Sequence, residues 1–214
     1  KQSKMTKFEA VKERLVQVDF AGQFYDEPQK KIGIVLHHTA GASAASSIAG
    51  WKQDAVKVGT CVVIDRDGKI LQCFPSDRWA YSLGINAANY KTIEKQTIAI
   101  EIASYGGLTK RGDDYYTAYN EIIAHEKVCD LGHIFKGKQY YELYTDAQIE
   151  SVKRLLELWH ERYGIDISYK GQEIFALNID ALAAKGGVYT HNSYRSDKSD
   201  ISPQPKIIKM LQSL

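Results

Sequence analysis

Two short apolar segments limit the fold of this chain more than any other feature. IGIVLHHTA occupies residues 32–40, and TIAIEIA occupies residues 97–103. Apolar runs of this length, bounded by small or polar residues, are typical of strands that are buried inside a sheet. We therefore predict core strands over residues 32–37 and 97–103.

The remaining pattern alternates strands with helices. Residues 61–73, CVVIDRDGKILQC, predict a hairpin, because two apolar runs flank an Asp-Gly turn. Residues 43–55 predict a helix, whereas residues 104–114, with glycines among charged side chains, predict a loop. Pro203 and Pro205 precede a short last helix, KIIKMLQSL.

The clearest helix covers residues 146–163. Thr145 and Gln148 form a capping box, apolar residues recur at helical spacing, and Gly164 is a natural stop. Strands interleaved with helices predict an α/β fold in which a mixed sheet is flanked by helices. The 214 residues are enough for a single domain with a sizeable core.

Composition narrows the class of protein. Apolar residues make up 44% of the chain and charged residues 25%, as in ordinary globular proteins. The net charge is +2 with the basic residues spread out, so neither nucleic acid nor a membrane is a predicted partner. The N-terminal segment lacks the apolar core of a signal peptide. Cys61 and Cys73 flank the predicted hairpin, and with Cys129 they make an odd count, so we expect buried thiols.

Three groups of polar residues interrupt this pattern. The first is the pair His37 and His38, at the end of a predicted strand. The second is Glu101, the only charge in TIAIEIA, and the third is YTHNSYRSDKSDISP, at residues 189–203. Each alone has a structural explanation: a satisfied histidine, a solvated strand face or a polar loop.

Together, the three groups match the chemistry of a hydrolytic zinc site. A catalytic zinc ion takes three protein ligands and leaves a fourth position for water. His37, His191 and Asp200 would supply two nitrogens and one oxygen. Glu101 would accept the proton of a water whose pKa the metal lowers to roughly 7. Lys198 would stabilise the oxyanion that develops on the substrate.

The same segments resemble the N-acetylmuramoyl-L-alanine amidases of the type-2 amidase superfamily. That family includes phage T7-type lysozyme, bacterial anhydro-muropeptide amidases and animal peptidoglycan recognition proteins. The resemblance rests on IVLHHTAG, TIAIEIA and HNSYRSDKSD, and also on VVIDRDGKILQ and YTDAQIESVKRLLELWHERYGI. Because it extends over about residues 32–205, we divide the chain into an N-terminal helical extension, residues 1–31, and a zinc amidase catalytic domain, residues 32–214.

The resemblance implies which residues bind the metal. In this family the first histidine of the strand-end pair is the zinc ligand, which selects His37 over His38. The other two ligands match His191 and Asp200. His38 is then expected to have a supporting or structural role.

The resemblance also implies the catalytic residues. Glu101 matches the general base, and Lys198 matches the residue that stabilises the reacting carbonyl. Members similar to T7 lysozyme use a tyrosine at the position of Thr60, so this chain follows the glutamate branch. Two positions depart from many relatives: Cys61 replaces a histidine, and Tyr81-Ser82 replaces a tryptophan-histidine pair. These departures affect the shape of the substrate groove rather than the metal ligands.

The implied activity is zinc-dependent hydrolysis of the amide bond between N-acetylmuramic acid and L-alanine of peptidoglycan. The chain is expected to be a monomer that acts on the cell wall, as a phage endolysin, an autolysin or a recycling enzyme. Two alternatives stay open: a non-catalytic peptidoglycan-binding module of the same fold, and a zinc peptidase that cuts the stem peptide. Binding modules usually lack one zinc ligand, whereas this sequence has all three, which favours the enzyme.

The other polar residues have ordinary explanations. We expect His125, His133 and His160 to be surface or helix residues. Arg195 is expected either to bind a carboxylate of the stem peptide or to form a surface ion pair. The many tyrosines of residues 115–144 are expected to pack between loop and sheet rather than to line a groove.

Overall fold

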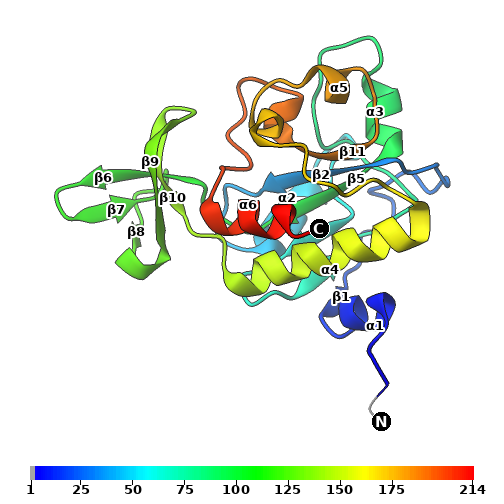
Figure 1. The fold of residues 1–214 in the computed structure, drawn as a ribbon, viewed down its shortest axis with the longest axis horizontal. Coiled ribbons are helices and arrows are strands. Elements are labelled where there is room, and N and C mark those ends of the chain that lie inside the picture. Colours follow the sequence, from blue (N-terminus) through cyan, green and yellow to red (C-terminus); the bar gives the residue numbers. More distant parts are fainter. Residues whose placement is uncertain (1–2) are drawn as a thin grey trace.

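Six strands form the main sheet of the computed structural model, which describes residues 3–214. Their order across the sheet is β1–β4–β3–β5–β2–β11, with β3 and β4 antiparallel and the other neighbours parallel (Figure 1). The strands are β1 (Leu15–Gln17), β2 (Gly33–His38), β3 (Val62–Ile64), β4 (Ile70–Gln72), β5 (Thr97–Ile102) and β11 (Gly187–Thr190). The predicted α/β fold, a mixed sheet flanked by helices, is confirmed.

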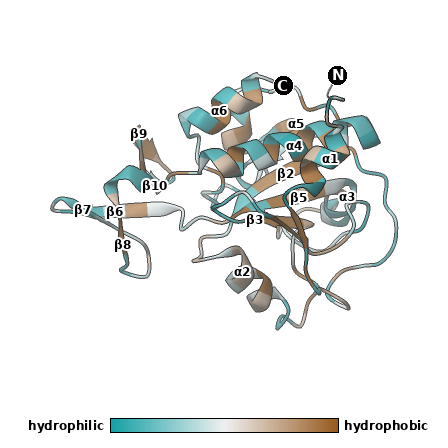
Figure 2. Cartoon of the chain, turned by 90° about the horizontal axis from the view of Figure 1, so that it is seen from below, coloured by the Kyte–Doolittle hydropathy of each residue, from teal (hydrophilic) through white to brown (hydrophobic). Residues whose placement is uncertain are grey.

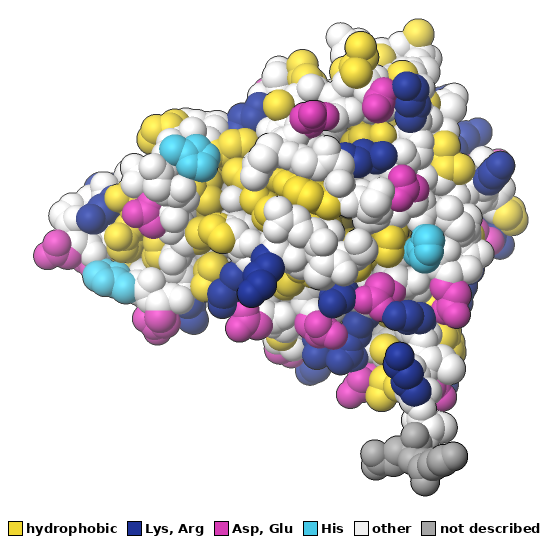
Figure 3. Space-filling view, viewed as in Figure 1, with side chains coloured by type: hydrophobic (Ala, Val, Ile, Leu, Met, Phe, Trp, Pro, Cys, Tyr) yellow, Lys and Arg dark blue, Asp and Glu magenta, His cyan; other side chains and the backbone are white. Residues whose placement is uncertain are grey.

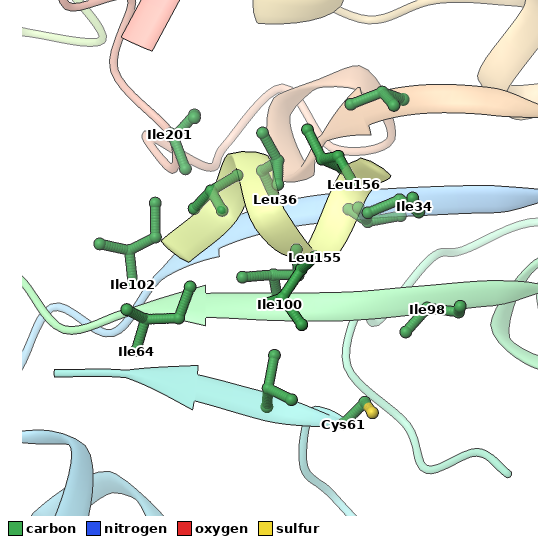
Figure 4. Packing of buried hydrophobic residues seen from close by; sticks show 14 of the residues in the cluster. Ile34, Leu36, Cys61, Ile64, Ile98, Ile100, Ile102, Leu155, Leu156 and Ile201 are labelled. Atoms are coloured by element: carbon green, nitrogen blue, oxygen red, sulfur yellow. The ribbon is translucent and has the colours of Figure 1, made fainter. Parts of the chain in front are cut away.

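β2 and β5 lie at the centre of this sheet, and every residue in both strands is buried. The two strands run parallel, with Ile34 opposite Ile98 and Leu36 opposite Ile100. Side chains that lie opposite each other share a face of the sheet. On this face they pack with Leu155 in the main hydrophobic core (Figure 4).

Helices cover both faces of the main sheet. The α-helices are α1 (Lys7–Lys12), α2 (Ala44–Trp51), α3 (Tyr90–Gln96), α4 (Asp146–Tyr163), α5 (Ile179–Leu182) and α6 (Pro205–Gln212). α4 and α6 lie on one side of the sheet, and α2 lies on the other (Figure 2). α4 has the predicted capping box at Thr145 and ends at Gly164, which has a φ of 70°. No helix within residues 3–214 is long and apolar enough to cross a membrane.

A second sheet projects from the body between β5 and α4 (Figure 1). Its strands are β6 (Gly107–Arg111), β7 (Asp114–Tyr116), β8 (Ile122–Ile123), β9 (Val128–Phe135) and β10 (Lys138–Glu142), in the order β8–β7–β6–β10–β9. The loop predicted over residues 104–114 is therefore wrong, because β6, a tight turn and the start of β7 lie there. Most of β6 is exposed and polar, so the apolar alternation that marks a strand is missing.

One ion pair ties the second sheet to the main body. Arg66, in the turn between β3 and β4, contacts the buried Glu142 at the end of β10, with 2.7 Å between Nη2 and Oε1. The backbone N–H of Tyr105 donates to the same Oε1 atom at 3.2 Å. The Arg66 guanidinium also lies 5.2 Å from the centre of the Tyr105 ring. These contacts fix the direction in which the chain leaves β5.

The segment that contains α1 and β1 packs against the same body. β1 pairs with β4 at the edge of the main sheet, and α1 packs on α4. Val11 and Phe20 are buried in the main core. Arg14 donates from Nη1 to the carbonyl oxygen of Ala147 at 2.9 Å. The predicted helical extension thus contains α1 and also a strand of the sheet.

The distribution of charged side chains and the state of the cysteines agree with what the composition predicts. Figure 3 shows basic and acidic side chains interspersed over one face of the molecule. Cys61, Cys73 and Cys129 are free thiols, and all three are buried. The backbone N–H of Cys73 donates to the carbonyl oxygen of Cys61 at 2.8 Å, so these two residues do lie across the hairpin from each other.

Candidate metal centre and its groove

Three parallel strands end at one edge of the main sheet and bring the polar residues together. His37 lies directly opposite Glu101 in the register of β2 and β5. Thr190, the last residue of β11, lies opposite Leu36 of β2, so His191 follows at the same edge. The carboxyl ends of parallel strands are the usual location of sites in such sheets. The order of the strands therefore unites residues that are far apart in the sequence.

The side chains of His37, His191 and Asp200 converge on one point. The two Nδ1 atoms are 3.1 Å apart. Oδ2 of Asp200 lies 2.9 Å from Nδ1 of His191 and 3.2 Å from Nδ1 of His37. All three residues are buried. They also form the one group of three potential metal-binding side chains found among residues 3–214.

The hydrogen bonds of His191 show which of its ring nitrogens faces the cluster. Its Nε2 lies 2.8 Å from the carbonyl oxygen of Leu83, which can only accept a hydrogen bond. Nε2 therefore donates to this carbonyl, and Nδ1 faces Asp200 at 2.9 Å. Contact between this nitrogen and a carboxylate oxygen is favourable when a proton or a metal ion lies between them. Two imidazole nitrogens and one carboxylate oxygen are a ligand set that suits zinc.

Burial and neighbouring groups keep His37 and Asp200 in the forms that bind metals. Burial, with a contribution from His191, lowers the pKa of His37 to about 4, so its ring is neutral. Burial raises the pKa of Asp200, but the imidazole rings of His191 and His37 beside it outweigh burial and hold this pKa well below the usual range. Metal binding requires neutral imidazole and ionised carboxylate. The three side chains therefore fit the metal that the sequence predicts.

His38 points away from this cluster. Its Nδ1 lies 2.7 Å from the hydroxyl oxygen of Tyr144, which accepts a hydrogen bond from the backbone N–H of Ser202 at 3.0 Å. On its other side the ring is packed against Gly106, where an added Cβ atom would lie 2.7 Å from Nε2. His38 is therefore held by structural contacts, and His37 is the histidine of the pair that faces Asp200.

Glu101 is buried beside the cluster, and no residue within 3–214 forms an ion pair with its carboxylate. Burial, and then the charge of Asp200, raise its pKa well above the usual value, whereas Lys198 lowers it. Lys198 is half-buried on the wall of the groove that contains the cluster. A carboxylate in such surroundings takes up a proton readily, which is the property that a general base needs.

A groove of about 920 Å³ opens over these residues. Trp51, Thr60 and Ser82 line it on one side. Tyr105, Tyr119 and Glu121, from the second sheet and the segment leading to it, line it as well. The hydroxyl of Tyr119 donates to the carbonyl oxygen of Ala40 at 3.3 Å, so this side chain connects the second sheet to the loop that follows β2.

Sequence reasoning missed the aromatic wall of this groove. The sequence predicts that Tyr119 packs between loop and sheet, but this side chain is 65% exposed and lines the groove. Trp51 and Glu121 line it too, and no sequence motif points to them. The sequence contains no local signal for this wall, because the second sheet that carries it was itself not predicted.

The remaining candidates lie outside the cluster. His125 and His133 are exposed on the second sheet, and His160 lies near the end of α4. Arg195 forms an ion pair with Asp197, with 2.6 Å between Nη2 and Oδ2. Two of the positions at which this sequence differs from many relatives lie in different surroundings. Ser82 lines the groove, whereas the Cys61 thiol is buried and donates to the carbonyl oxygen of Phe74 at 3.3 Å.

Comparison with known proteins gives one family. A family model described as N-acetylmuramoyl-L-alanine amidase matches residues 28–205. The solved structure of PlyL is similar, with 14% identity and a TM-score of 0.51, covering 93% of this chain and 96% of that one.

Two other solved structures are similar to the same extent. A mutant endolysin from Bacillus subtilis has 14% identity and a TM-score of 0.51, over 93% of this chain and 97% of that one. The hydrolase AmiA from Staphylococcus aureus, in complex with its ligand, has 13% identity and a TM-score of 0.50, over 99% and 90%. At such identities the likeness concerns the fold. Comparison with curated protein sequences gives no match.

Proposed function

Because the chain belongs to the N-acetylmuramoyl-L-alanine amidase family, we propose that it is a zinc hydrolase that cleaves the amide bond between N-acetylmuramic acid and L-alanine of peptidoglycan. One observation carries this proposal. The donor atoms of His37, His191 and Asp200 lie within 3.2 Å of one another, next to the buried carboxylate Glu101 and on the floor of a groove.

In this proposal the three clustered residues would hold the zinc ion, with Nδ1 of His37, Nδ1 of His191 and Oδ2 of Asp200 as the converging donor atoms. A zinc ion at such a site acts as a Lewis acid towards the substrate carbonyl and makes water more acidic. The buried surroundings strengthen these electrostatic effects, because the local dielectric constant is low.

Glu101 is the proposed general base. It takes the proton of the attacking water and passes that proton to the nitrogen of the leaving L-alanine. Burial supports this role, because it raises the pKa of Glu101 and so makes the protonated intermediate state accessible. Its place opposite His37 in the sheet keeps the carboxylate beside the cluster at a separation fixed by backbone hydrogen bonds.

Lys198 is proposed to stabilise the substrate oxygen. A cation on the groove wall interacts more strongly with the negative charge of the tetrahedral intermediate than with a neutral carbonyl. Support comes from its proximity to Glu101, whose pKa it lowers. The same charge also keeps a fraction of Glu101 ionised, as a base requires.

The test is digestion of purified peptidoglycan with and without a chelator, with the products identified by mass spectrometry. We expect chelator-sensitive release of peptides that begin with a free L-alanine amine, and glycan with intact muramic acid. His191→Ala should abolish release, whereas His133→Ala, which alters an exposed histidine, should not.

Other outcomes would replace the proposal with one of its rivals. Products cut within the stem peptide would identify a zinc peptidase. Binding of peptidoglycan without any release, in the presence of added zinc, would identify a non-catalytic binding module.

A further inference from the structure

The two histidines of the proposed metal centre are supported very differently. Nε2 of His37 is buried, and no partner for it exists among residues 3–214. Nε2 of His191 lies 2.8 Å from the carbonyl oxygen of Leu83, which is 108 residues away in the sequence. The orientation and tautomer of His191 therefore depend on where Leu83 is held.

A buried glutamate holds this segment. Glu94 of α3 is 3% exposed, and its Oε1 accepts a hydrogen bond from the backbone N–H of Leu83 at 2.9 Å. Its Oε2 accepts one from the backbone N–H of Ser82 at 3.1 Å and lies 3.4 Å from the Ser82 hydroxyl. The carboxylate therefore holds two successive backbone N–H groups, those of Ser82 and Leu83.

Leu83 connects the two side chains. Its backbone N–H donates to Glu94 at 2.9 Å, and its carbonyl oxygen lies 2.8 Å from Nε2 of His191. Because both backbone groups belong to one residue, the hydrogen bonds to Glu94 determine where the Leu83 carbonyl lies. The carboxylate therefore acts on the ring of His191 through the backbone of one residue.

The chemistry of Glu94 also distinguishes it from a simple packing residue. No residue within 3–214 forms an ion pair with it, although burial of an unpaired charge is costly. A carboxylate offers two oxygens that only accept, and here both are used by backbone donors. Glutamine in its place would bring an NH2 group against an N–H donor.

We propose that Glu94 is a positioning residue of the metal centre, which fixes the 82–84 segment so that the Leu83 carbonyl holds the Nε2–H tautomer of His191. This inference rests on the proposed function, because it assumes that His191 is a metal ligand. Outer partners of a metal-bound histidine fix its tautomer and ring orientation, and their loss typically costs about 10- to 100-fold in metal affinity.

The experiment compares Glu94→Gln with Glu142→Gln. Both glutamates are buried, and both accept a hydrogen bond from a backbone N–H, but Glu142 pairs with Arg66 at the base of the second sheet. Zinc affinity is measured by competition with a chromophoric chelator, and folding is checked by circular dichroism. We expect Glu94→Gln to weaken zinc binding by about tenfold or more, and Glu142→Gln to leave it unchanged.

A second measurement needs no variant. Nitrogen-15 NMR of the metal-free wild-type protein reports which ring nitrogen of His191 carries the proton. We expect Nε2–H in the wild type and a mixture of tautomers in Glu94→Gln. An Nδ1–H tautomer in the wild type would overturn the proposal, even if Glu94→Gln failed to fold. So would a folded Glu94→Gln protein with wild-type zinc affinity.

These readouts are independent of hydrolysis. A wild-type protein that binds zinc and has the expected tautomer, but does not cleave peptidoglycan, would contradict the proposed function and leave the role of Glu94 intact. Normal cleavage together with unchanged zinc affinity in Glu94→Gln would contradict the role of Glu94 and leave the proposed function intact.

Discussion

Lys31 is a buried cation without a neighbouring carboxylate in hydrogen-bond contact. Its side chain precedes β2 and is 2% exposed. Nζ donates to the carbonyl oxygens of Lys95 at 2.8 Å and Thr97 at 3.0 Å, where α3 ends. Carbonyl groups at a helix C-terminus favour a positive charge, but burial opposes it. Burial prevails and lowers the pKa of Lys31 to about 8.

This pKa makes stability depend on pH in a predictable direction. Unfolded lysine keeps its ordinary pKa of 10.5, so between about pH 8 and pH 10.5 the unfolded chain binds more protons than the native one. Stability contributed by Lys31 therefore rises with pH across that window. Relative to Lys31→Met, the wild-type free energy of unfolding should increase by about 2 to 3 kcal/mol from pH 7 to pH 10 in urea titrations. A difference that stays constant with pH would show that the native ammonium is not destabilised.

Glu101 gives a second prediction at the scale of the residue. Glu101→Gln keeps the shape of the side chain but removes its ability to take a proton. We expect turnover of muropeptides to fall by at least about 100-fold, because general-base catalysis contributes on this order. Zinc content, measured by elemental analysis, should remain that of the wild type. Asp200→Ala should lose both turnover and zinc. Retention of zinc by this variant would contradict the role of Asp200 as a ligand.

The candidate site could be predicted at the level of its residues, but only with the aid of the family pattern. His37, His191 and Asp200 were selected from the sequence, and the structure brings their donor atoms together. Glu94 could not be found in this way, because a carboxylate on a short helix looks like any surface glutamate until the helix is folded against the 82–84 segment.

At the scale of the element, replacing glycine by alanine is expected to change the stability of the protein in opposite directions at two positions. Gly164 ends α4 with a φ of 70°, and Gly50 lies inside α2 with no unusual φ. A Cβ atom would meet nothing within 4 Å at either position, so only the backbone decides. Gly164→Ala should destabilise the protein by about 1 kcal/mol, because alanine is strained in the left-handed region. Gly50→Ala should stabilise it by about 0.5 to 1 kcal/mol, because alanine favours helix.

Thermal or urea unfolding of the two variants checks this pair. Neither residue contacts the proposed metal ligands, so zinc affinity provides the control. Equal signs for the two substitutions would contradict the backbone explanation.

The second sheet predicts an effect on substrate binding. Tyr119 lines the groove and packs edge-to-face with Tyr105, with 6.4 Å between ring centres. Tyr119→Ala should lower kcat/KM on peptidoglycan fragments by about 3- to 10-fold, mainly through KM, which corresponds to a lost aromatic contact of roughly 1 kcal/mol. Zinc affinity should not change. Ile134→Ala, at another exposed apolar side chain of the second sheet, should have no effect on either quantity. If both variants behaved alike, the wall would have no part in binding.

Elements were predictable where burial produces a clear pattern. β2, β5 and α4 are buried in the core or carry a full apolar stripe with caps, and the sequence predicts each within a residue or two. The sequence does not predict the second sheet, because its strands are largely exposed and are stabilised by pairing with each other. They therefore lack the apolar pattern of a buried strand. β1 was missed for a similar reason: it is three residues long and gains its order from β4.

At the scale of the whole molecule, the N-terminal segment tests where the domain begins. The sequence suggests a boundary at residue 32, but Phe20 is 2% exposed in the core, and β1 completes the main sheet. A chain that begins at residue 32 should therefore lose at least about 3 kcal/mol of stability, the typical cost of removing one buried phenylalanine side chain. A chain that begins at residue 5 keeps α1, its N-cap Thr6 and β1, and serves as the control. Identical unfolding midpoints for the two chains would support an extension that the catalytic domain does not need.

The pairing of β2 with β11 also determines when the proposed metal centre can form. His37 and His191 are separated by 154 residues, so their donor atoms meet only after these two strands have paired. A nascent or partly folded chain holds at most one or two of the three donor groups in place. Such a chain has no preformed site, so tight capture of the ion is reserved for the finished native state. Metal uptake would then report that the chain has completed its native fold.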